Sequence, residues 1–340
     1  MIKTLIILLM SLWLLNSCQN KVYAPNTFIV IRYNSFLSDS YTDIAKVNFY
    51  KETQNAIVYL EVGYQIDTKK LDFMMEGFED YYYQMTNTYG KPTDIDNNGK
   101  IIILLVNMNG NVGGFFATED LIYGVRNNAE ILYLDIISFN NNYEILTIES
   151  VFHEFQHLIN HNVNFIQKGY SIKWLNETLS ESVNAIYSKR GKNDGNFIAT
   201  EKYYCFYTWN LERYLDAIYY YNFMNYDSAE EFIWYLFEKN NENPEVFKRI
   251  AHSSEREGYK RILSAVSDMG IGNTWKEVLY NFAKYILDNA TYVKCFPSNT
   301  TVPLYPGAFI FYEENGEYKI ALNPDTYIGN SPKPIYFTTP

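Results

Sequence analysis

Histidine and cysteine are scarce in this sequence, with four histidines and three cysteines among 340 residues. The cysteines at positions 18, 205 and 295 are too far apart to form a cluster with the ligand spacing of a structural zinc site. If Cys18 belongs to an export signal, only Cys205 and Cys295 remain for the folded part. An exported protein could pair them, and two separate buried thiols are an equally good reading.

Positive charge is also in short supply. The chain has 28 Lys and Arg against 39 Asp and Glu, which gives a net charge of −11. An acidic protein repels a phosphate backbone, so the sequence argues against nucleic acid as a partner. Hydrophobic residues make up 47% of the chain, which is enough to build the cores of one or two domains.

No hydrophobic run is long enough to span a bilayer comfortably, and the longest lies at residues 5–15 after the charged Lys3. This layout is typical of a secretory signal. It resembles a bacterial lipoprotein signal, in which Cys18 would carry the lipid and anchor the exported protein at the cell envelope. Asn16 departs from the usual small or apolar residue of that signal. The alternative is ordinary cleavage near Ser17 and secretion.

Hydrophobic periodicity predicts strands in the N-terminal part and helices after it. From about residue 147 to 290 the pattern is mostly helical. The C-terminal part returns to strands, with an Asn315-Gly316 turn that is typical of a β-hairpin. The predicted early elements are a strand at 27–33, two strands within 46–62 around a polar turn at 52–55, a helix at 67–88 and strands at 100–106 and 130–136. The predicted hairpin covers 308–322.

A polar stretch before the strand at 100–106 could bind calcium. Asp94, Asp96 and Asn98, followed by Gly99, match the opening of a calcium loop. An EF-hand loop would carry glutamate at its twelfth position, where this sequence has Leu105. We therefore favour an Asx-rich turn, with calcium as the alternative.

The segment VFHEFQHLINHN at 151–162 contains three of the four histidines. In a helix, its apolar residues share one face while His153 and His157 lie one turn apart on the other. This is the H-E-x-x-H pattern, in which both histidines bind one zinc ion and Glu154 acts as general base. His161 would lie about 12 Å along the axis from His153, too far to share the metal.

A second helix, predicted at 174–191, offers the remaining ligand. Its apolar face leaves Glu177 and Glu181 together on the opposite side, one turn apart. Glu177 would complete a set of two histidines and one glutamate, which leaves a fourth zinc position open for catalysis. Glu181 would hold an imidazole N–H of a zinc ligand.

The segments HEFQH and WLNETLSE together resemble the gluzincin pattern of thermolysin-like enzymes, and more closely the hyicolysin family of bacterial neutral metallopeptidases. The resemblance covers about residues 75–290 and includes flanking segments at 89–105, 128–136 and 226–240. Thr178 stands where many relatives carry glycine. The resemblance implies an edge strand that aligns substrate, for which Asn128, Ala129 and Glu130 are candidates, and an oxyanion-stabilising residue, for which Tyr226 and His252 are candidates.

These features predict an α+β fold with a zincin-like catalytic domain, made of a mixed sheet and an active-site helix. The predicted divisions are a signal peptide at 1–17, a tether at 18–26, an N-terminal β segment at 27–66, a catalytic subdomain at 67–190, a helical subdomain at 191–294 and a β-rich appendage at 295–340.

The predicted function is a zinc endopeptidase that cleaves extracellular or surface proteins and is held at the membrane by a lipid anchor. The alternative is a surface lipoprotein that keeps a metallopeptidase scaffold for binding and has lost peptide cleavage. The residues of the zinc motif favour the enzyme, because every member of the catalytic core is present.

Overall fold

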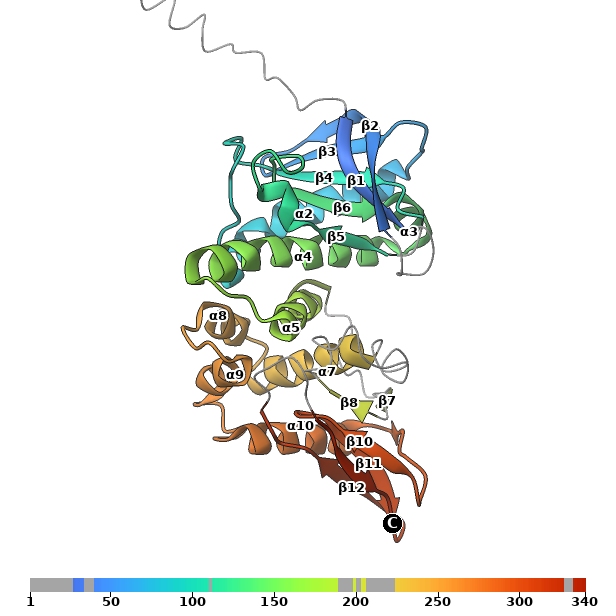
Figure 1. Ribbon diagram of the computed structural model, residues 1–340, viewed down its shortest axis with the longest axis vertical. Helices are drawn as coiled ribbons and strands as arrows, with labels where there is room; N and C mark the ends of the chain where they lie inside the picture. Colours follow the sequence, from blue (N-terminus) through green and yellow to red (C-terminus); the bar gives the residue numbers. More distant parts are fainter. Residues whose placement is uncertain are drawn as a thin grey trace, which may run out of the picture.

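The computed structural model describes residues 27–33, 40–109, 112–188, 198–199, 203–205, 224–326 and 333–340. The predicted signal, tether and Cys18 lie outside these residues, as does the predicted boundary between 190 and 191. Figure 1 shows a half built around a curled sheet, followed by a half of helices that ends in a small group of strands. The mixed α/β architecture agrees with the predicted α+β class.

The main sheet has the strand order β1-β2-β3-β4-β6-β5. Strands β3, β4 and β6 run parallel, whereas β1, β2 and β5 pair antiparallel with their neighbours. The parallel strand β4 is buried on both faces, as its unbroken apolar sequence predicts. The strands are β1 (Thr27–Tyr33), β2 (Ser40–Glu52), β3 (Ala56–Glu61), β4 (Ile101–Val106), β5 (Gly114–Phe116) and β6 (Ile131–Asp135).

The two faces of the sheet bury different sets of side chains, because successive residues of a strand point to opposite sides. In β4, Ile101, Ile103 and Leu105 pack with the helices, and the residues between them join a second cluster with Phe28 and Val47. The sheet curls so that β1 and β2 supply part of that second cluster (Figure 1). The helical face is therefore the one against which the histidine helix can lie.

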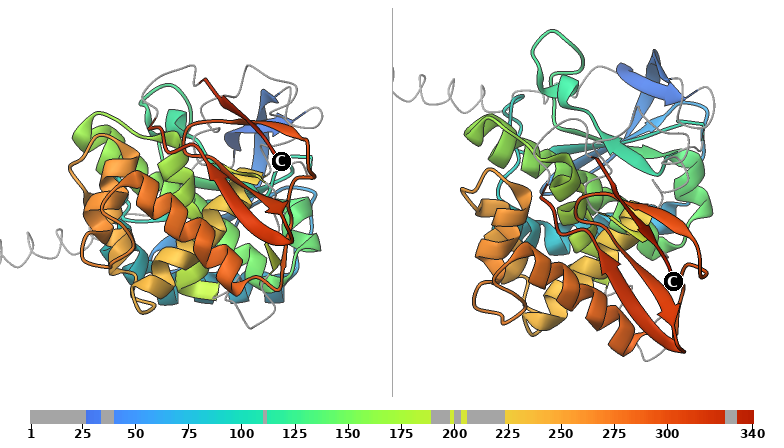
Figure 2. Two further views of the ribbon diagram at one scale, coloured as in Figure 1. Left: turned by 90° about the horizontal axis from the view of Figure 1, so that it is seen from below. Right: turned by 60° about the horizontal axis from the view of Figure 1, so that its bottom comes forward.

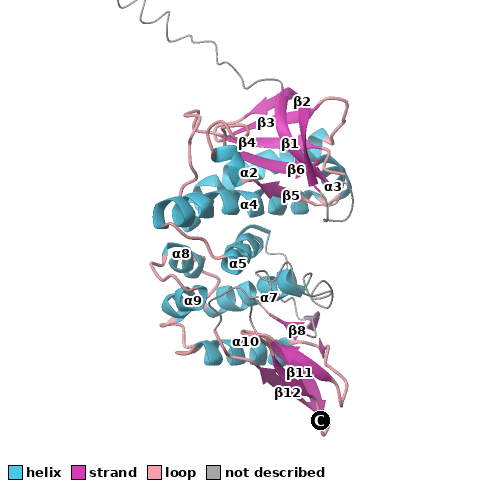
Figure 3. Cartoon of the chain, viewed as in Figure 1, coloured by secondary structure: helices cyan, strands magenta, loops and turns pink. Residues whose placement is uncertain are grey.

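Two long helices cover that face, α2 (Thr68–Tyr89) and α4 (Glu144–Asn160). Asp67 begins α2 by accepting hydrogen bonds from the backbone N–H groups of Lys69 and Lys70. Phe78 of α2 packs on α4, with its ring 5.7 Å from that of Phe152 and 5.3 Å from that of Phe155. A short helix, α3 (Ile136–Asn141), leads from β6 toward α4. Figure 3 shows this layer of helices between the sheet and the helices of the second half.

The second half contains α5 (Lys173–Val183), α7 (Met224–Lys239), α8 (Glu245–His252), α9 (Gly258–Val266) and α10 (Trp275–Asn289). Two π-helical turns, His161–Ile166 and Asn184–Ser188, extend α4 and α5 at their C-terminal ends. In the described part of the chain, no helix combines the length and apolar character needed to cross a membrane.

Short strands close the chain beside α10, as the views of Figure 2 show. The predicted hairpin is confirmed, because Asn315 and Gly316 both have positive φ and join paired strands. Tyr204 stacks on Phe309 and so ties the hairpin to an earlier strand. Cys205 follows that strand and forms no disulfide with Cys295. The strands are β7 (Ile198–Ala199), β8 (Tyr203–Tyr204), β9 (Tyr292–Val293), β10 (Thr301–Leu304), β11 (Phe309–Glu314), β12 (Glu317–Leu322) and β13 (Ile335–Thr338).

The edge of the main sheet next to α4 is β5, and the predicted edge strand around Asn128, Ala129 and Glu130 is wrong. These residues lead into β6, which is paired with β4 on one side and β5 on the other. Ala129 and Glu130 are buried, and Asn128 accepts a hydrogen bond from the Gly124 N–H within its own loop. Pairing order is a tertiary property, so the apolar sequence of β6 could not reveal its neighbours.

Gly114 sets how closely β5 approaches β6 and α4. A Cβ atom at Gly114 would lie 2.6 Å from the carbonyl oxygen of Tyr133 and 3.3 Å from Cγ of Glu154. We expect Gly114→Ala to lower the free energy of unfolding by about 1–3 kcal/mol, because the backbone of β6 cannot give way easily. Gly113→Ala is the matched control, since its Cβ would meet only the Ser150 hydroxyl at 3.7 Å. Urea unfolding measures both, and equal stability of the two variants would contradict the close approach.

Candidate metal centre and cleft

The histidine helix α4 buries one face and turns the other toward α5. Val151, Phe152 and Phe155 are completely buried in the main core. His153 and His157 lie on the opposite side with 18% and 13% of their side chains exposed. The two Nε2 atoms lie 3.1 Å apart. The spacing of four residues in one helix therefore brings both imidazoles to one point, as the motif predicts.

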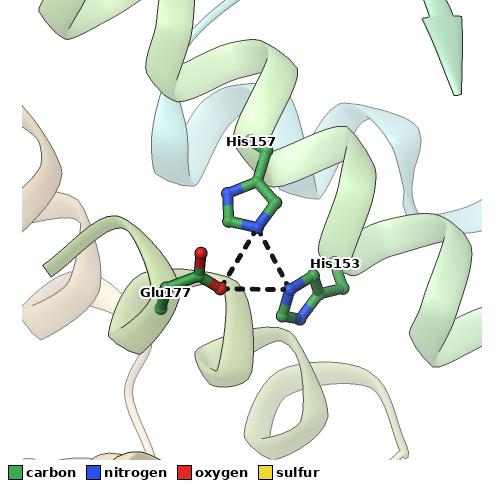
Figure 4. Close-up of side chains that lie close together, drawn as sticks. All are labelled: His153, His157 and Glu177. Carbon is green, nitrogen blue, oxygen red and sulfur yellow. Dashed lines mark hydrogen bonds and ion pairs between the residues drawn. The ribbon is translucent and has the colours of Figure 1, made fainter. Parts of the chain in front are cut away.

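Glu177 reaches the same point from α5 (Figure 4). Its Oε2 atom lies 3.6 Å from Nε2 of His153 and 3.4 Å from Nε2 of His157. Helix α5 lies against α4 because its apolar side chains, including Leu175 and Leu179, join the same core. The structure thus brings together the three ligands predicted from two separate sequence segments.

The spacing of these three atoms matches that of ligands on one tetrahedral zinc ion. Ligand atoms about 2.0–2.1 Å from zinc, at tetrahedral angles, lie about 3.3 Å from each other. The three separations here are 3.1, 3.4 and 3.6 Å. Two imidazole nitrogens and one carboxylate oxygen are also the donor types of catalytic zinc sites. The residues present therefore fit zinc.

The remaining nitrogen of each imidazole has its own partner. His153 Nδ1 lies 3.1 Å from Oε1 of Glu181, where the sequence predicted such a contact. His157 Nδ1 lies 3.0 Å from the Ser180 hydroxyl, which donates its own hydrogen to Oε1 of Gln156 at 2.6 Å. These contacts are satisfied when Nδ1 of each ring carries the proton, which leaves each Nε2 lone pair for the shared point.

The sequence reading missed Ser180 and Gln156. Both are almost completely buried, and Ser180 lies between the two predicted acids on α5. A buried hydroxyl one turn from a metal ligand could have pointed to this role, although serine is too common in helices to be specific.

The centre carries more negative than positive charge. Glu154, Glu177 and Glu181 surround the two imidazoles, and Glu154 is buried. Burial raises the pKa of Glu154, and the charges of the two imidazoles oppose that rise. Burial lowers the pKa of His153, but the hydrogen bonds to Glu177 and Glu181 outweigh it and raise that pKa. A divalent cation would neutralise this surplus and displace protons from the imidazoles.

The centre lies in a cleft of about 770 Å³ between the edge of the sheet and α5. Strand β5 forms one wall, and the π-helical turn after α4 contributes Phe165 and Ile166. His161 also lines the cleft, with its ring stacked 5.0 Å from that of Phe165. It is not among the residues whose ligand atoms converge on His153, His157 and Glu177.

The two candidates for oxyanion stabilisation lie in different places. Tyr226 lines the cleft, and its hydroxyl lies 3.4 Å from Oε2 of Glu177. His252 lies at the end of α8 beside Gly90, where a Cβ would be 3.5 Å from its ring. His252 is not among the described residues that line the cleft, so Tyr226 is the better placed of the two candidates. Sequence alone could not decide between them, because neither residue belongs to a motif.

Two of the three predicted calcium ligands, Asp94 and Asp96, lie close to a further acid. Asp94, Asp96 and Glu130 each offer a carboxylate oxygen, and these oxygens lie within 4.8 Å of one another. The Oδ1 of Asn98, the third predicted ligand, accepts a hydrogen bond from the Lys100 N–H at 2.6 Å. Glu130 is an acid of this group that the sequence analysis did not identify as a calcium ligand.

Comparisons with known proteins give one limited similarity. No protein-family model matches the sequence. The neutral metalloprotease ShpI of Staphylococcus hyicus is 28% identical over 120 residues, covering 30% of this chain and 27% of that protein. The match thus spans about a quarter of the relative's length. This similarity supports a relationship to metalloproteases, and such a relationship implies a metal.

Removing each histidine in turn tests which of them hold the metal. We expect His153→Ala, His157→Ala and Glu177→Ala each to abolish stoichiometric zinc binding, because two ligands hold zinc poorly in a site built for three. Glu181→Ala should weaken zinc binding by about 10- to 100-fold, as loss of a group that orients a ligand does.

His161→Ala is the matched control, because it removes an imidazole from the same cleft without touching the three ligand atoms. Plasma mass spectrometry of the dialysed proteins measures the zinc content. Retention of zinc by Glu177→Ala together with its loss from His161→Ala would show that the third ligand is misassigned.

Proposed function

We propose that this protein is a zinc-dependent endopeptidase of the gluzincin type that hydrolyses protein substrates. The carrying observation is the convergence of two imidazole nitrogens and one carboxylate oxygen at 3.1–3.6 Å, beside the buried Glu154, in an open cleft. The partial similarity to a metalloprotease points in the same direction.

His153, His157 and Glu177 would hold zinc, which when bound supplies a Lewis acid for a carbonyl and lowers the pKa of a coordinated water. Glu154 takes the proton of the attacking water and delivers it to the leaving amine. Burial prepares Glu154 for this task, because the raised pKa makes it a better base than an exposed glutamate.

Strand β5 aligns the substrate. An edge strand has one row of unpaired backbone groups, to which an extended peptide can add as a further strand. Gly114 brings this edge to within contact of the Glu154 side chain, so a peptide bound along β5 passes directly by the general base. The role first assigned to Asn128, Ala129 and Glu130 therefore passes to Gly114, Phe115 and Phe116.

Tyr226 stabilises the oxyanion in this proposal. Its hydroxyl reaches the cleft next to Glu177 from α7, the helix that follows α5 in the described second half. Burial raises the pKa of Tyr226, as do the charges of Glu177, Glu181 and Glu154, so the phenol keeps its proton. A protonated phenol is the donor that a developing negative charge on oxygen requires.

Glu154→Gln separates catalysis from metal binding. The substitution keeps the shape of the side chain and removes the base, so we expect casein hydrolysis to fall by about 10²- to 10⁴-fold. Zinc content should stay at the wild-type level. Glu144→Gln is the control, because Glu144 is an exposed acid of the same helix. If zinc-loaded wild type is as inactive as Glu154→Gln on varied proteins, the alternative of a non-catalytic binding protein replaces the enzyme.

Cys18 anchors the protein at the bacterial cell envelope in this proposal. We expect Cys18→Ala to move the protein from the membrane fraction to the soluble fraction, because Cys18 is the residue that would carry the lipid. Incorporation of labelled fatty acid, followed by fractionation, measures this. A wild-type protein that is soluble and unlabelled would favour ordinary cleavage near Ser17 and secretion.

A further inference from the structure

The turn before β4 holds two aspartates in a fixed arrangement. Oδ1 of Asp94 accepts a hydrogen bond from the Gly99 N–H at 3.0 Å, and Oδ1 of Asp96 accepts one from the Asn98 N–H at 3.1 Å. These are Asx-type contacts, as the sequence predicts for this turn. Oδ2 of Asp96 accepts a further hydrogen bond from the Asn98 side-chain amide at 2.6 Å, but each carboxylate oxygen has two lone pairs, so both aspartates keep acceptor capacity for a cation.

Glu130 approaches this turn from the start of β6. The Ile102 N–H donates to the Glu130 carbonyl at 2.8 Å, so strand pairing fixes Glu130 beside the beginning of β4. Its Oε1 accepts a hydrogen bond from the Ile95 N–H at 2.8 Å, between the two aspartates. Its Oε2 is buried and has no hydrogen-bond partner among the residues that the structure describes. The Glu130 residue has 0% exposure, which makes an unsatisfied carboxylate oxygen costly.

No positive side chain of the described chain forms an ion pair with these three acids. Lys100, four residues after Asp96, instead pairs with Glu52 at 3.2 Å and donates to the Gln54 carbonyl. The surrounding protein raises the pKa of Asp96 to about 6, first by desolvation and further by the charges of Glu130 and Asp94. Three carboxylates therefore converge without a protein cation to balance them.

We propose that Asp94, Asp96 and Glu130 bind a calcium ion, at a site separate from the zinc centre. All three donors are carboxylate oxygens, and a set of oxygens alone suits a hard cation better than zinc. Calcium fits better than magnesium because the ligands come from an irregular turn and a strand end, and calcium tolerates irregular geometry with six to eight oxygens. Glu130 supplies from β6 the acid that a calcium loop with this opening carries at its twelfth position, where this chain has Leu105.

The proposed calcium site is linked to the cleft through one residue. Ile95, which is held by Glu130, is one of the residues that line the cleft around the zinc centre. A calcium ion bound at this turn would hold Glu130 in place, and through it the part of the cleft wall that Ile95 forms. Calcium binding itself does not depend on hydrolysis, so it can be tested whether or not the protein cleaves peptides.

Calorimetric titration of zinc-loaded full-length protein with calcium chloride tests the site. We expect the wild type to bind about one calcium ion per chain, with a dissociation constant of about 10⁻³ M or tighter. Glu130→Gln and Asp94→Asn should each bind at least about tenfold more weakly, because each removes one charge from the ligand set. Asp80→Asn is the matched control, since it removes an exposed aspartate of α2 and should bind calcium as the wild type does.

Thermal unfolding gives a second readout that a purely structural role of Glu130 would not produce. Without calcium, Glu130→Gln should unfold at or above the wild-type temperature, because it removes repulsion among three acids. With calcium in excess the order should reverse. Asp94→Asn should show the same reversal, which keeps the test valid if Glu130→Gln does not fold.

Three results would overturn the proposal. The first is no heat of binding and no change in unfolding temperature up to about 10 mM calcium, well above the weakest calcium modules. The second is calcium binding by Glu130→Gln or Asp94→Asn that equals the wild type. The third is tighter binding of magnesium than calcium in a parallel titration, which would assign the site to magnesium. None of these outcomes depends on peptidase activity, so the calcium site is tested even if the protein does not cleave peptides.

Discussion

The contact between α4 and α5 is the interaction on which the rest of the structure depends. It brings the Glu177 carboxylate to within 3.4–3.6 Å of two imidazole nitrogens that α4 holds 3.1 Å apart. If α5 moved away from α4 by one ångström, the Glu177 oxygen would lie beyond the separation of about 4 Å that two ligands of one zinc ion allow. Both helices must therefore be held rigidly from their other sides.

The supports on those other sides are apolar and tightly packed. Helix α4 lies on the sheet and on α2, where Phe78 contacts two of its rings. The first turn of α5 contains Trp174, whose ring leaves so little room that a Cβ at Gly258 would lie 2.4 Å from it. Rigid cores of this kind allow polar groups to be buried in fixed orientations. Ser180 and Gln156 are such buried groups, and their hydrogen bonds hold Nδ1 of His157 on the side away from the centre.

Folding brings two groups of acids together, one on the facing helices α4 and α5 and the other where the turn before β4 meets the start of β6. One surrounds the imidazoles with three glutamates, and the other gathers Asp94, Asp96 and Glu130. Like charges brought together by folding cost free energy unless a cation offsets them. The zinc proposal and the calcium proposal apply this same electrostatic argument to different donor sets, one with nitrogen ligands and one with oxygen alone.

The sequence by itself determined the local features. Helical spacing identified α4 and the facing pair His153 and His157, and the fixed rise of a helix separated His161 from them. The apolar runs identified β1, β3, β4, β6 and the second half of β2, and Asn315-Gly316 identified the hairpin, whereas the short edge strand β5 was not predicted. These inferences hold because each depends on residues within about one or two turns of the same element.

Only the tertiary structure decided which distant residues meet. Strand order made β5 the edge in place of β6, and the register of β4 with β6 brought Glu130 to the turn of Asp94 and Asp96. The packing of α8 on α2 removed His252 from the cleft, and the packing of α5 on α4 gave Ser180 its role. No local periodicity encodes these contacts, because pairing and packing partners are chosen by the burial and charge balance of the whole fold.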